Sequence, residues 1–310
     1  MTSAPGRFAL ALVLAGVLSA WPAIPQARQS RPEWITRAVS APGVEQRTFM
    51  SAAAGTEVSY HIYRPPSYDE QPERRFPVVY WLHGSGGGLA GISDLSARYD
   101  RAIRRGLAPP ALVVFVNGLA GGMYVDWKDG SRPVESVIIR DLIPHIDASW
   151  RTLPAREGRL IEGFSMGGYG AARLGFKYPD LFGAVSILGA GPMQPDLVAD
   201  APRASRLRAL ETLNAAYGGD RAHFLAVSPL TLAEAAAPRL SGNTIIRLAV
   251  GRSDETYANN LAFHQHLQEL GVRHDWITPE GVGHDPGALL NALGADNWSF
   301  YRRVFLPGNP

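Results

Sequence analysis

The sequence contains no cysteine. This absence excludes disulfide bonds, thiolate metal sites, a cysteine nucleophile and a lipidated N-terminal cysteine. It does not fix the redox compartment, because cysteine-free proteins occur in both oxidising and reducing environments. Lysine is scarce as well, since Lys128 and Lys177 are the only two and the remaining cationic residues are arginine. We interpret this as a compositional bias without functional content.

The sequence also lacks a strong charge of either sign. Its formal net charge is +2 over 310 residues, so it has no broad basic field for nucleic acid and we expect no nucleic-acid partner. Internal repeats are absent too. The 46% hydrophobic and 19% charged residues are typical of a globular protein, and the length suits one α/β catalytic domain that carries an insertion.

Residues 1–27 have the pattern of a secretory signal peptide. Arg7 precedes an uncharged apolar run over residues 8–20, and small residues and prolines follow the run. The run is short for a membrane span, and an uncleaved membrane anchor is the alternative. We therefore expect a secreted or periplasmic protein without stable membrane insertion after signal removal, with a lead-in over residues 28–42 and a catalytic domain over residues 43–310.

The most specific motif is the stretch Gly163-Phe164-Ser165-Met166-Gly167, which has the G-x-S-x-G spacing of a nucleophile elbow. In such an elbow, a strained strand-to-helix turn exposes the serine Oγ, and the glycines let neighbouring backbone pass close by. A strand candidate at residues 159–161 precedes the motif, and residues 166–178, suited to a buried helix, follow it. This context favours Ser165 as a nucleophile over the alternative of a serine that only caps the helix.

The rest of the chain alternates strand patterns with helix patterns. We predict strands at residues 44–51, 56–63, 76–82, 111–116, 184–188, 244–250 and 272–278, and helices at residues 93–106, 134–150, 256–270 and 285–305. Pro144 is expected either to kink its helix or to split it in two. Residues 191–242 contain alanine-rich helical pieces at 201–217 and 230–236, and we interpret this segment as an insertion over the active-site face. The alternation predicts a mainly parallel sheet with right-handed crossovers.

A glycine-rich loop, His83-Gly84-Ser85-Gly86-Gly87-Gly88, follows the apolar run at residues 76–82. No G-x-x-x-x-G-K-[ST] pattern accompanies it, so a phosphate-binding loop is not indicated. Glycines allow backbone N–H groups to point at a developing negative charge, which favours an oxyanion loop over a plain connector. We expect His83 to hold this loop by hydrogen bonding and to do no chemistry.

A serine nucleophile needs a base, and in chains with such an elbow the acid and then the histidine follow the serine. His284 lies in a glycine-flanked loop just after the last predicted strand, where a base can reach a serine at the strand ends. The alternative is an ordinary surface-loop histidine. The other histidines after Ser165 are less suitable: one lies in the insertion, two lie within a helix and one lies within a predicted strand, namely His223, His264, His266 and His274.

Asp254 is the favoured orienting acid, because it closely follows the predicted strand at residues 244–250. Two alternatives stay open: Ser253 or Asp254 caps the helix that begins near Thr256, or the neighbouring Glu255 is the acid. A metal pair of His264 and His266 is disfavoured, because residues two apart lie on different faces of a helix. We expect no metal and no cofactor.

These residues resemble the esterase D family of α/β-hydrolases, which includes S-formylglutathione hydrolases, feruloyl and acetylxylan esterases and the antigen 85 mycolyltransferases. The likeness runs from about Tyr63 to His284. It is densest in Asp141-Leu142-Ile143-Pro144-His145-Ile146, in residues 163–171 and in Tyr178-Pro179-Asp180-Leu181-Phe182. The resemblance implies the α/β-hydrolase fold, with a mainly parallel central sheet flanked by helices.

The resemblance also implies roles for individual residues. The backbone N–H groups of Ser85 and Met166 would form the oxyanion hole, and Asp254 and His284 would complete a triad with Ser165. A further residue, Trp127, follows an aspartate as in the mycolyltransferases and would line the acyl or alcohol site.

The expected function is that of a serine carboxylic-ester hydrolase that forms an acyl-enzyme on an extracytoplasmic small-molecule or glycan ester. One alternative is an exported acyltransferase that uses the same triad. The other is a non-catalytic hydrolase-fold protein that binds a glycan or another partner. Two departures from the family pattern leave the substrate open: Asp285 and Pro286 after the histidine, and the unmatched segment 191–242.

Overall fold

The computed structural model describes residues 1, 2 and 33–306, except residues 90, 202 and 241. The predicted signal peptide, apart from its first two residues, and the start of the lead-in lie outside the described residues. The chain divides into two units, and all that follows concerns the second, residues 32–310. None of the helices in the described part combines the length and apolar character that a membrane crossing requires.

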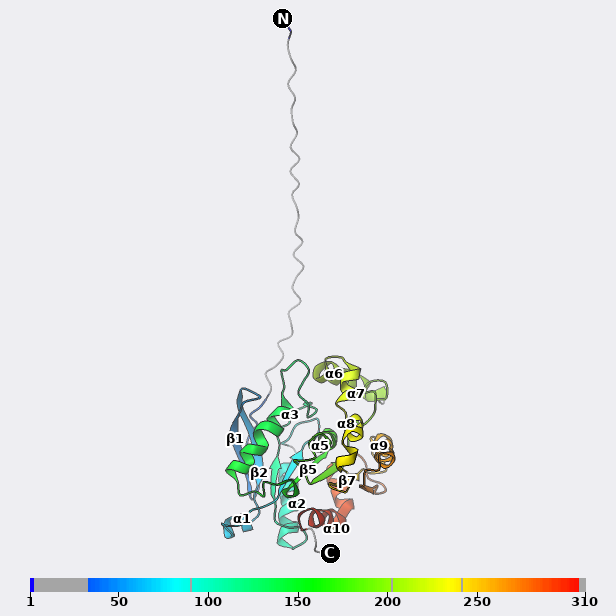
Figure 1. Cartoon of the computed structure of the whole chain (residues 1–310). Helices are drawn as coiled ribbons and strands as arrows, with labels where there is room; N and C mark the ends of the chain where they lie inside the picture. The colour runs from blue at the N-terminus through cyan, green and yellow to red at the C-terminus, as the bar shows by residue number, and fades with distance from the viewer. Residues whose placement is uncertain (3–32, 90, 202, 241, 307–310) are drawn as a thin grey trace. The chain divides into compact units, whose positions relative to one another are not determined.

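An eight-stranded sheet forms the centre of this unit, with the strand order β1-β2-β4-β3-β5-β6-β7-β8 (Figure 1). Strands β1, β2 and β4 pair antiparallel, and β3 to β8 all run parallel. The strands are β1 Val44–Ser51, β2 Thr56–Tyr63, β3 Val78–Leu82, β4 Leu112–Phe115, β5 Arg159–Phe164, β6 Ala184–Leu188, β7 Ile245–Ala249 and β8 Asp275–Ile277. The predicted fold class is confirmed.

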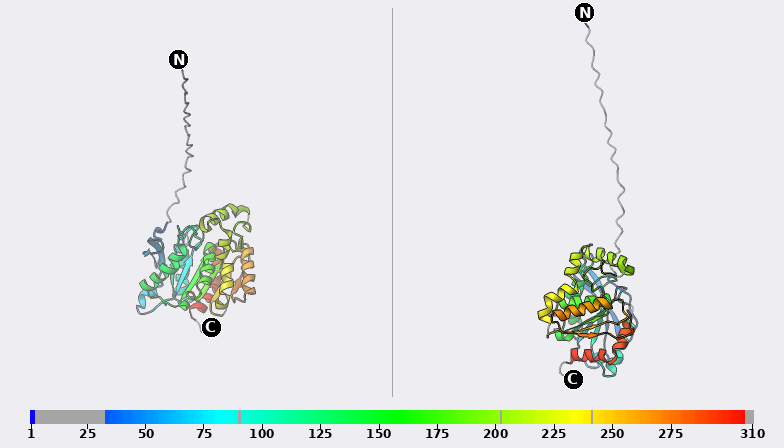
Figure 2. Two further views of the ribbon diagram at one scale, coloured as in Figure 1. Left: turned by 45° about the horizontal axis from the view of Figure 1, so that its top comes forward. Right: turned by 90° about the vertical axis from the view of Figure 1, so that its right-hand side faces the viewer.

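Two helical layers cover the two faces of the sheet (Figures 1 and 2). Strand β3 has apolar side chains on both faces: Val79 and Trp81 belong to one hydrophobic cluster with α2 (Ile92–Arg104) and α10 (Pro286–Phe305), whereas Val78, Tyr80 and Leu82 belong to the other. The helices of this second cluster include α5 (Met166–Lys177), α8 (Pro229–Leu240) and α9 (Tyr257–Glu269). A strand with apolar side chains on both faces is stable only when both faces are covered.

Helices α2, α5, α9 and α10 match the predicted ones to within two residues at each end. The helices are α2 Ile92–Arg104, α5 Met166–Lys177, α6 Arg206–Tyr217, α7 Arg221–Ala226, α8 Pro229–Leu240, α9 Tyr257–Glu269 and α10 Pro286–Phe305. The run from α3 (Val134–Ser136) to α4 (Ile143–Ser149) is bridged by π-helical bonding over Val137–Leu142. Pro144 therefore does not split the run, and it lies in the first turn of α4, where a missing N–H is tolerated. The short helix α1 spans Ser67–Glu70.

Three expectations differ from the structure. The last strand covers only Asp275–Ile277, so His274 precedes it. The prediction that His274 lies within a strand was wrong, since the backbone pairing of β8 with β7 begins at Asp275, which lies opposite Arg247. Helix α6 begins at Arg206 and not at residue 201, and α7 was not predicted.

A buried ion pair joins the strands on the α2 and α10 face. Glu162 of β5 and Arg247 of β7 are both fully buried, and Arg247 Nη2 donates to Glu162 Oε2 over 2.6 Å. Arg247 Nε also donates to Ser186 Oγ of β6 over 3.0 Å, and its Nη1 donates to Asn297 of α10. Tyr99 of α2 donates to the other oxygen of Glu162. The pair thus links three adjacent strands to both helices of this layer.

We expect Arg247→Met to lower the free energy of unfolding by about 3–5 kcal/mol, because it leaves the buried Glu162 carboxylate without its cation. Urea denaturation of the purified chain measures this. The control is Arg239→Gln, which removes a surface pair with Asp180 and is expected to cost less than about 1 kcal/mol. If Arg247→Met lowered the free energy of unfolding as little as Arg239→Gln does, the buried pair would not stabilise the sheet as proposed.

Candidate active site

The candidate site lies where the strand connections diverge. Helix α2, which follows β3, covers one face of the sheet, and α5, which follows β5, covers the other. In open parallel sheets a crevice forms outside the carboxyl ends of two such neighbouring strands. The loop at residues 83–88 follows β3 and Ser165 follows β5, so the topology brings the two predicted motifs together.

Ser165 occupies a strained turn between β5 and α5. Its φ of 59° and ψ of −122° lie outside the regions that residues with a side chain ordinarily adopt. Close packing around the turn requires the flanking glycines: a Cβ on Gly163 would lie 2.3 Å from the Gly167 carbonyl oxygen, and a Cβ on Gly167 would lie 1.9 Å from that of Leu82. The elbow therefore exists only with glycine at both positions.

A continuous hydrogen-bond relay leads from Ser165 into the protein. The Ser165 Oγ lies 2.9 Å from His284 Nε2, and His284 Nδ1 lies 2.9 Å from both carboxylate oxygens of Asp254. The Asp254 side chain is 1% exposed, whereas the His284 side chain is 27% exposed. The Phe164 ring packs against the imidazole with ring centroids 4.7 Å apart. Asp254 and the Phe164 ring thus hold the imidazole, and its Nε2 faces Ser165.

The contacts within the relay shift the pKa values of His284 and Asp254. The hydrogen bond to Asp254 raises the pKa of His284 above its ordinary value, although burial acts in the opposite direction. For Asp254, burial alone would raise the pKa, but hydrogen bonds from His284 and Thr256 outweigh it and hold that pKa below its ordinary value. Asp254 is therefore a carboxylate at neutral pH, and because it only accepts hydrogen bonds, the His284 proton lies on Nδ1.

The Asp254 carboxylate contacts both Thr256, the residue that precedes α9, and His284. Its Oδ1 accepts from the Thr256 N–H over 2.7 Å and from the Thr256 hydroxyl over 2.8 Å, next to the start of α9. The same carboxylate contacts His284. The rival Glu255 is exposed and forms no ion pair among the described residues, although its charge contributes to the raised His284 pKa.

Two other histidines that follow Ser165 in the sequence contact each other: His264 on α9 and His274 just before β8. His264 Nδ1 lies 2.7 Å from His274 Nε2, and the His264 ring stacks on Trp276. Within the described residues, no three acidic or histidine side chains gather as metal ligands.

The glycine-rich loop after β3 is held by a second loop, residues 117–127. The His83 Nδ1 donates to the Gly84 carbonyl over 2.7 Å, and its Nε2 accepts from the Gly118 N–H over 3.1 Å. Burial lowers the pKa of His83, which keeps the ring neutral as these two bonds require. Tyr124 Oη donates to the His83 carbonyl, and the Gly121 N–H donates to the Ser85 carbonyl. His83 therefore holds the loop, as expected from its position.

The supporting loop is itself strained. Leu119, Met123 and Tyr124 have φ values of 57°, 56° and 53°, in the left-handed region that non-glycine residues rarely adopt. Such conformations cost of order 1–3 kcal/mol each and persist where surrounding contacts over-determine them. Here the buried Arg173 of α5 donates to the Tyr124 carbonyl and pairs with the buried Glu135.

Trp127 lies at the end of the same loop. Its Nε1 approaches the Gly122 carbonyl at 3.4 Å, and the Arg132 guanidinium lies over its ring. The preceding Asp126 accepts from both the N–H and the hydroxyl of Ser136. Trp127 does not line the cavity at Ser165 described next, and its contact with a substrate stays a prediction.

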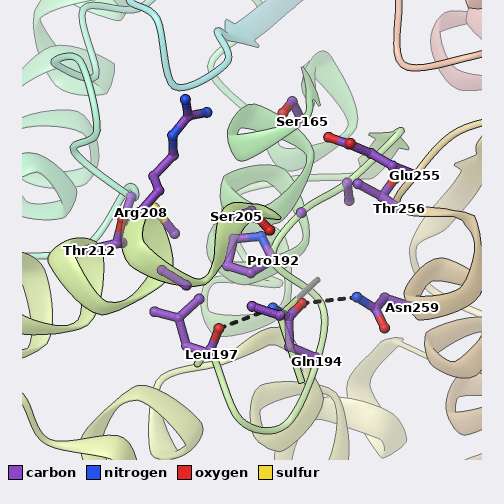
Figure 3. Close-up of a pocket in the computed structure, with 15 residues that line it drawn as sticks. Ser165, Pro192, Gln194, Leu197, Ser205, Arg208, Thr212, Glu255, Thr256 and Asn259 are labelled. Atoms are coloured by element: carbon purple, nitrogen blue, oxygen red, sulfur yellow. Dashed lines mark hydrogen bonds between the residues drawn. The ribbon is translucent and has the colours of Figure 1, made fainter. Parts of the chain in front are cut away.

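A cavity of about 190 Å³ opens beside Ser165 (Figure 3). Residues of the segment 191–242 form much of its wall, with Met123 from the strained loop and residues that follow Asp254 completing it. The wall residues from the segment are Gly191, Pro192, Gln194, Leu197, Ala201, Ser205, Arg208, Ala209 and Thr212. The segment interpreted as an insertion thus reaches the serine.

Sequence reasoning missed several residues that support the site. Glu162 and Arg247 are charged residues within otherwise apolar strands, and this contrast was an available signal. Arg173 lay in an apolar helix and gave the same signal. Nothing in the sequence indicated that Tyr124 adopts a left-handed backbone or that Arg208 faces the cavity.

The sheet order, the strained serine after β5 and the relay to a histidine after β8 define this chain as an α/β-hydrolase. The family model described as "Putative esterase" matches residues 51–305, and the chain belongs to this family. The resemblance to the esterase family is therefore confirmed.

Individual relatives agree with this membership. The chain is 30% identical over 174 residues to an endo-1,4-beta-xylanase/feruloyl esterase of Xylanibacter ruminicola, a match that covers 51% of this chain and 23% of that protein. It is 25% identical to an acetyl esterase of Caldicellulosiruptor saccharolyticus, over 70% of this chain and 83% of that one. Among solved structures, a ferulic acid esterase aligns with a TM-score of 0.70 and 22% identity, over 84% of this chain and 98% of that chain. The chain thus spans less than a quarter of the first relative.

Gly167→Ala is expected to lower the free energy of unfolding by about 1–3 kcal/mol, because the added methyl group meets the Leu82 backbone, which cannot turn aside as a side chain can. Thermal or urea unfolding measures the loss. In the control Gly86→Ala the methyl group meets no atom within 4 Å, and we expect a change within about 0.5 kcal/mol. A tolerant Gly167→Ala variant would show that the elbow is less tightly packed than its contacts indicate.

Proposed function

We propose that this chain is a serine carboxylic-ester hydrolase in which Ser165 is the nucleophile, His284 the general base and Asp254 the orienting acid. The observation that carries this proposal is the unbroken relay of 2.9 Å contacts from Ser165 Oγ through the His284 ring to Asp254. Membership of the esterase family supports the same reaction class.

In the first half of the reaction, His284 Nε2 accepts the Ser165 proton while Ser165 Oγ attacks the ester carbonyl carbon. Asp254 keeps the His284 Nδ1–H directed into the protein, so that the lone pair of Nε2 faces the serine. The imidazolium then donates its proton to the departing alkoxide, and an acyl-enzyme on Ser165 results.

The negative charge that develops on the carbonyl oxygen needs donors fixed in advance. Met166 is the first residue of α5, so its N–H has no acceptor within the helix. Ser85 supplies the second N–H in this proposal, and the bond from Gly121 to the Ser85 carbonyl supports a fixed orientation for this part of the loop. Loss of one such donor typically lowers turnover by about 10²–10³-fold.

In the second half, His284 activates a water molecule that releases the acyl group and regenerates Ser165. Each proton transfer is assigned to His284, and no step in this sequence requires a metal or cofactor. An alcohol acceptor in place of water would make the same chemistry an acyl transfer. Product analysis with added alcohols separates these two outcomes.

The substrate is proposed to be a small-molecule or glycan ester with a compact group beside Ser165. A cavity of about 150 Å³ holds a benzene ring, so the cavity of about 190 Å³ here suits a single ring or a short chain. Relatives named feruloyl esterase and acetyl esterase are consistent with groups of this size. The signal-peptide pattern in residues 1–27 supports an ester outside the cytoplasm.

Ser165→Ala is expected to lower kcat/KM for p-nitrophenyl acetate by roughly 10⁶-fold, because no other hydroxyl can replace the nucleophile in the relay. Release of p-nitrophenol measures turnover, and labelling by a fluorophosphonate should disappear together with it. The control Ser93→Ala changes an exposed serine on α2 and should retain both. Undiminished turnover in Ser165→Ala would mean another nucleophile, and a wild-type chain that resists labelling would favour a non-catalytic binding protein.

The pH dependence of kcat/KM follows from the raised pKa of His284. His284 acts as a base only when neutral, so activity should fall as the pH drops through a midpoint above the ordinary histidine value of about 6.5. Asp254→Asn removes the hydrogen-bonded charge, so the midpoint should move to lower pH while the plateau falls by about 10⁴-fold. Glu255→Gln should move the midpoint in the same direction but less. An acid limb that Asp254→Asn leaves in place would contradict the assignment of His284.

A further inference from the structure

The cavity beside Ser165 carries opposite charges on its two sides. Figure 3 shows the Arg208 side chain, which comes from α6, on one side of Ser165, and the Glu255 carboxylate on the other. Both residues line the cavity. The two charges form no ion pair with each other.

Among the described residues, the Arg208 guanidinium has no partner of its own. No described residue accepts a hydrogen bond or an ion pair from it. Its neighbours on the same segment differ, because Arg206 donates to the Ala199 carbonyl and Arg221 pairs with Asp196 over 3.0 Å. Arg208 is thus a cation directed at the cavity whose hydrogen-bonding groups are available to a ligand.

Two hydroxyl side chains accompany this cation. Ser205 and Thr212 stand three residues before and four residues after Arg208 and also line the cavity. Residues at these spacings share one face of a helix. A guanidinium binds a carboxylate through two parallel N–H donors, and neighbouring hydroxyl groups can donate to the same anion. Arg208 and Thr212 therefore place N–H and O–H donors on one face of α6 at the cavity.

The negative charges lie on the other side of the site. Glu255 and Asp285 both contribute to the raised pKa of His284, which places their charges near the imidazole. A substrate carboxylate is repelled from that side and attracted to Arg208.

We propose that Arg208 forms an anion subsite that selects esters carrying a carboxylate on the part of the molecule that fills this cavity. The proposal rests on the esterase function proposed above and specifies its substrate class as acidic esters, such as half-esters of dicarboxylic acids or esters of carboxylated phenols or sugars.

Two matched substrate pairs test the subsite. p-Nitrophenyl adipate and p-nitrophenyl hexanoate differ by a carboxylate on the acyl half, and 4-acetoxybenzoate and 4-acetoxybenzamide differ by one on the alcohol half. For at least one pair, the ratio of kcat/KM for the anionic to the neutral ester should fall about tenfold in Arg208→Gln and further in Arg208→Glu. Arg208→Lys should retain part of the wild-type preference for the anionic ester. In the wild type, the ratio should decline with added salt.

The matched control is Arg206→Gln, which removes a cation from the same helix outside the cavity lining and should leave both ratios unchanged. A binding measurement that needs no turnover accompanies the kinetics: calorimetric titration with adipate should give a Kd about tenfold weaker for Arg208→Gln than for the wild type. Ratios and a Kd that Arg208→Gln leaves unchanged would overturn the anion subsite. Hydrolysis that survives in Ser165→Ala would instead overturn the proposed function.

Discussion

The ion pair between Glu162 and Arg247 connects the elements that lead to Ser165, Asp254 and His284. Glu162 lies three residues before Ser165 on β5, and Arg247 lies on β7, the strand that leads to Asp254. Tyr301 and Asn297 bind the pair from α10, the helix that begins just after His284. A shift of β7 by one residue would turn Arg247 to the other face of the sheet and leave two buried charges unpaired, at several kcal/mol for each ion. The pair therefore acts mainly on register, because a buried ion pair contributes little net stability compared with apolar residues of the same size.

The strained backbone lies where the sheet topology brings the loop after β3 and the turn after β5 together. The loop after β3 and the turn after β5 meet because their helices leave on opposite faces of the sheet. At this meeting point the backbone at Ser165, Met123 and Tyr124 adopts left-handed φ values, and buried contacts such as Arg173 to the Tyr124 carbonyl hold it there. Strain of this kind requires rigid surroundings, and the covered parallel sheet supplies them.

Much of the fold could be predicted because its signals are local. Strands β1, β2 and β6 match their predicted bounds, since apolar alternation or a continuous apolar run between turn residues decides them. The elbow was also readable, because steric limits at Ser165 require glycine at fixed spacing. The π turn before Pro144 and the short β8 were not readable, because hydrogen bonding and edge pairing depend on neighbours in space. The partners of Arg247 and the direction of Arg208 are tertiary facts of the same kind, and Trp127 shows that a familiar motif need not lie at the cavity beside the serine.

Helix α6 lines the cavity but carries none of the relay residues. Its C-terminal end is fixed to the core, where Tyr217 contacts the Tyr169 hydroxyl at 3.1 Å and the Lys128 N–H donates to the Ala216 carbonyl. The buried residues of α6 all lie in this half, whereas the half that carries Arg208 faces the cavity and solvent. None of the relay residues belongs to α6, and the buried ion-pair network behind them comes from β5, β7 and α10. The width and charge of the cavity can therefore vary with the sequence of α6 while the distances between Ser165, His284 and Asp254 stay the same.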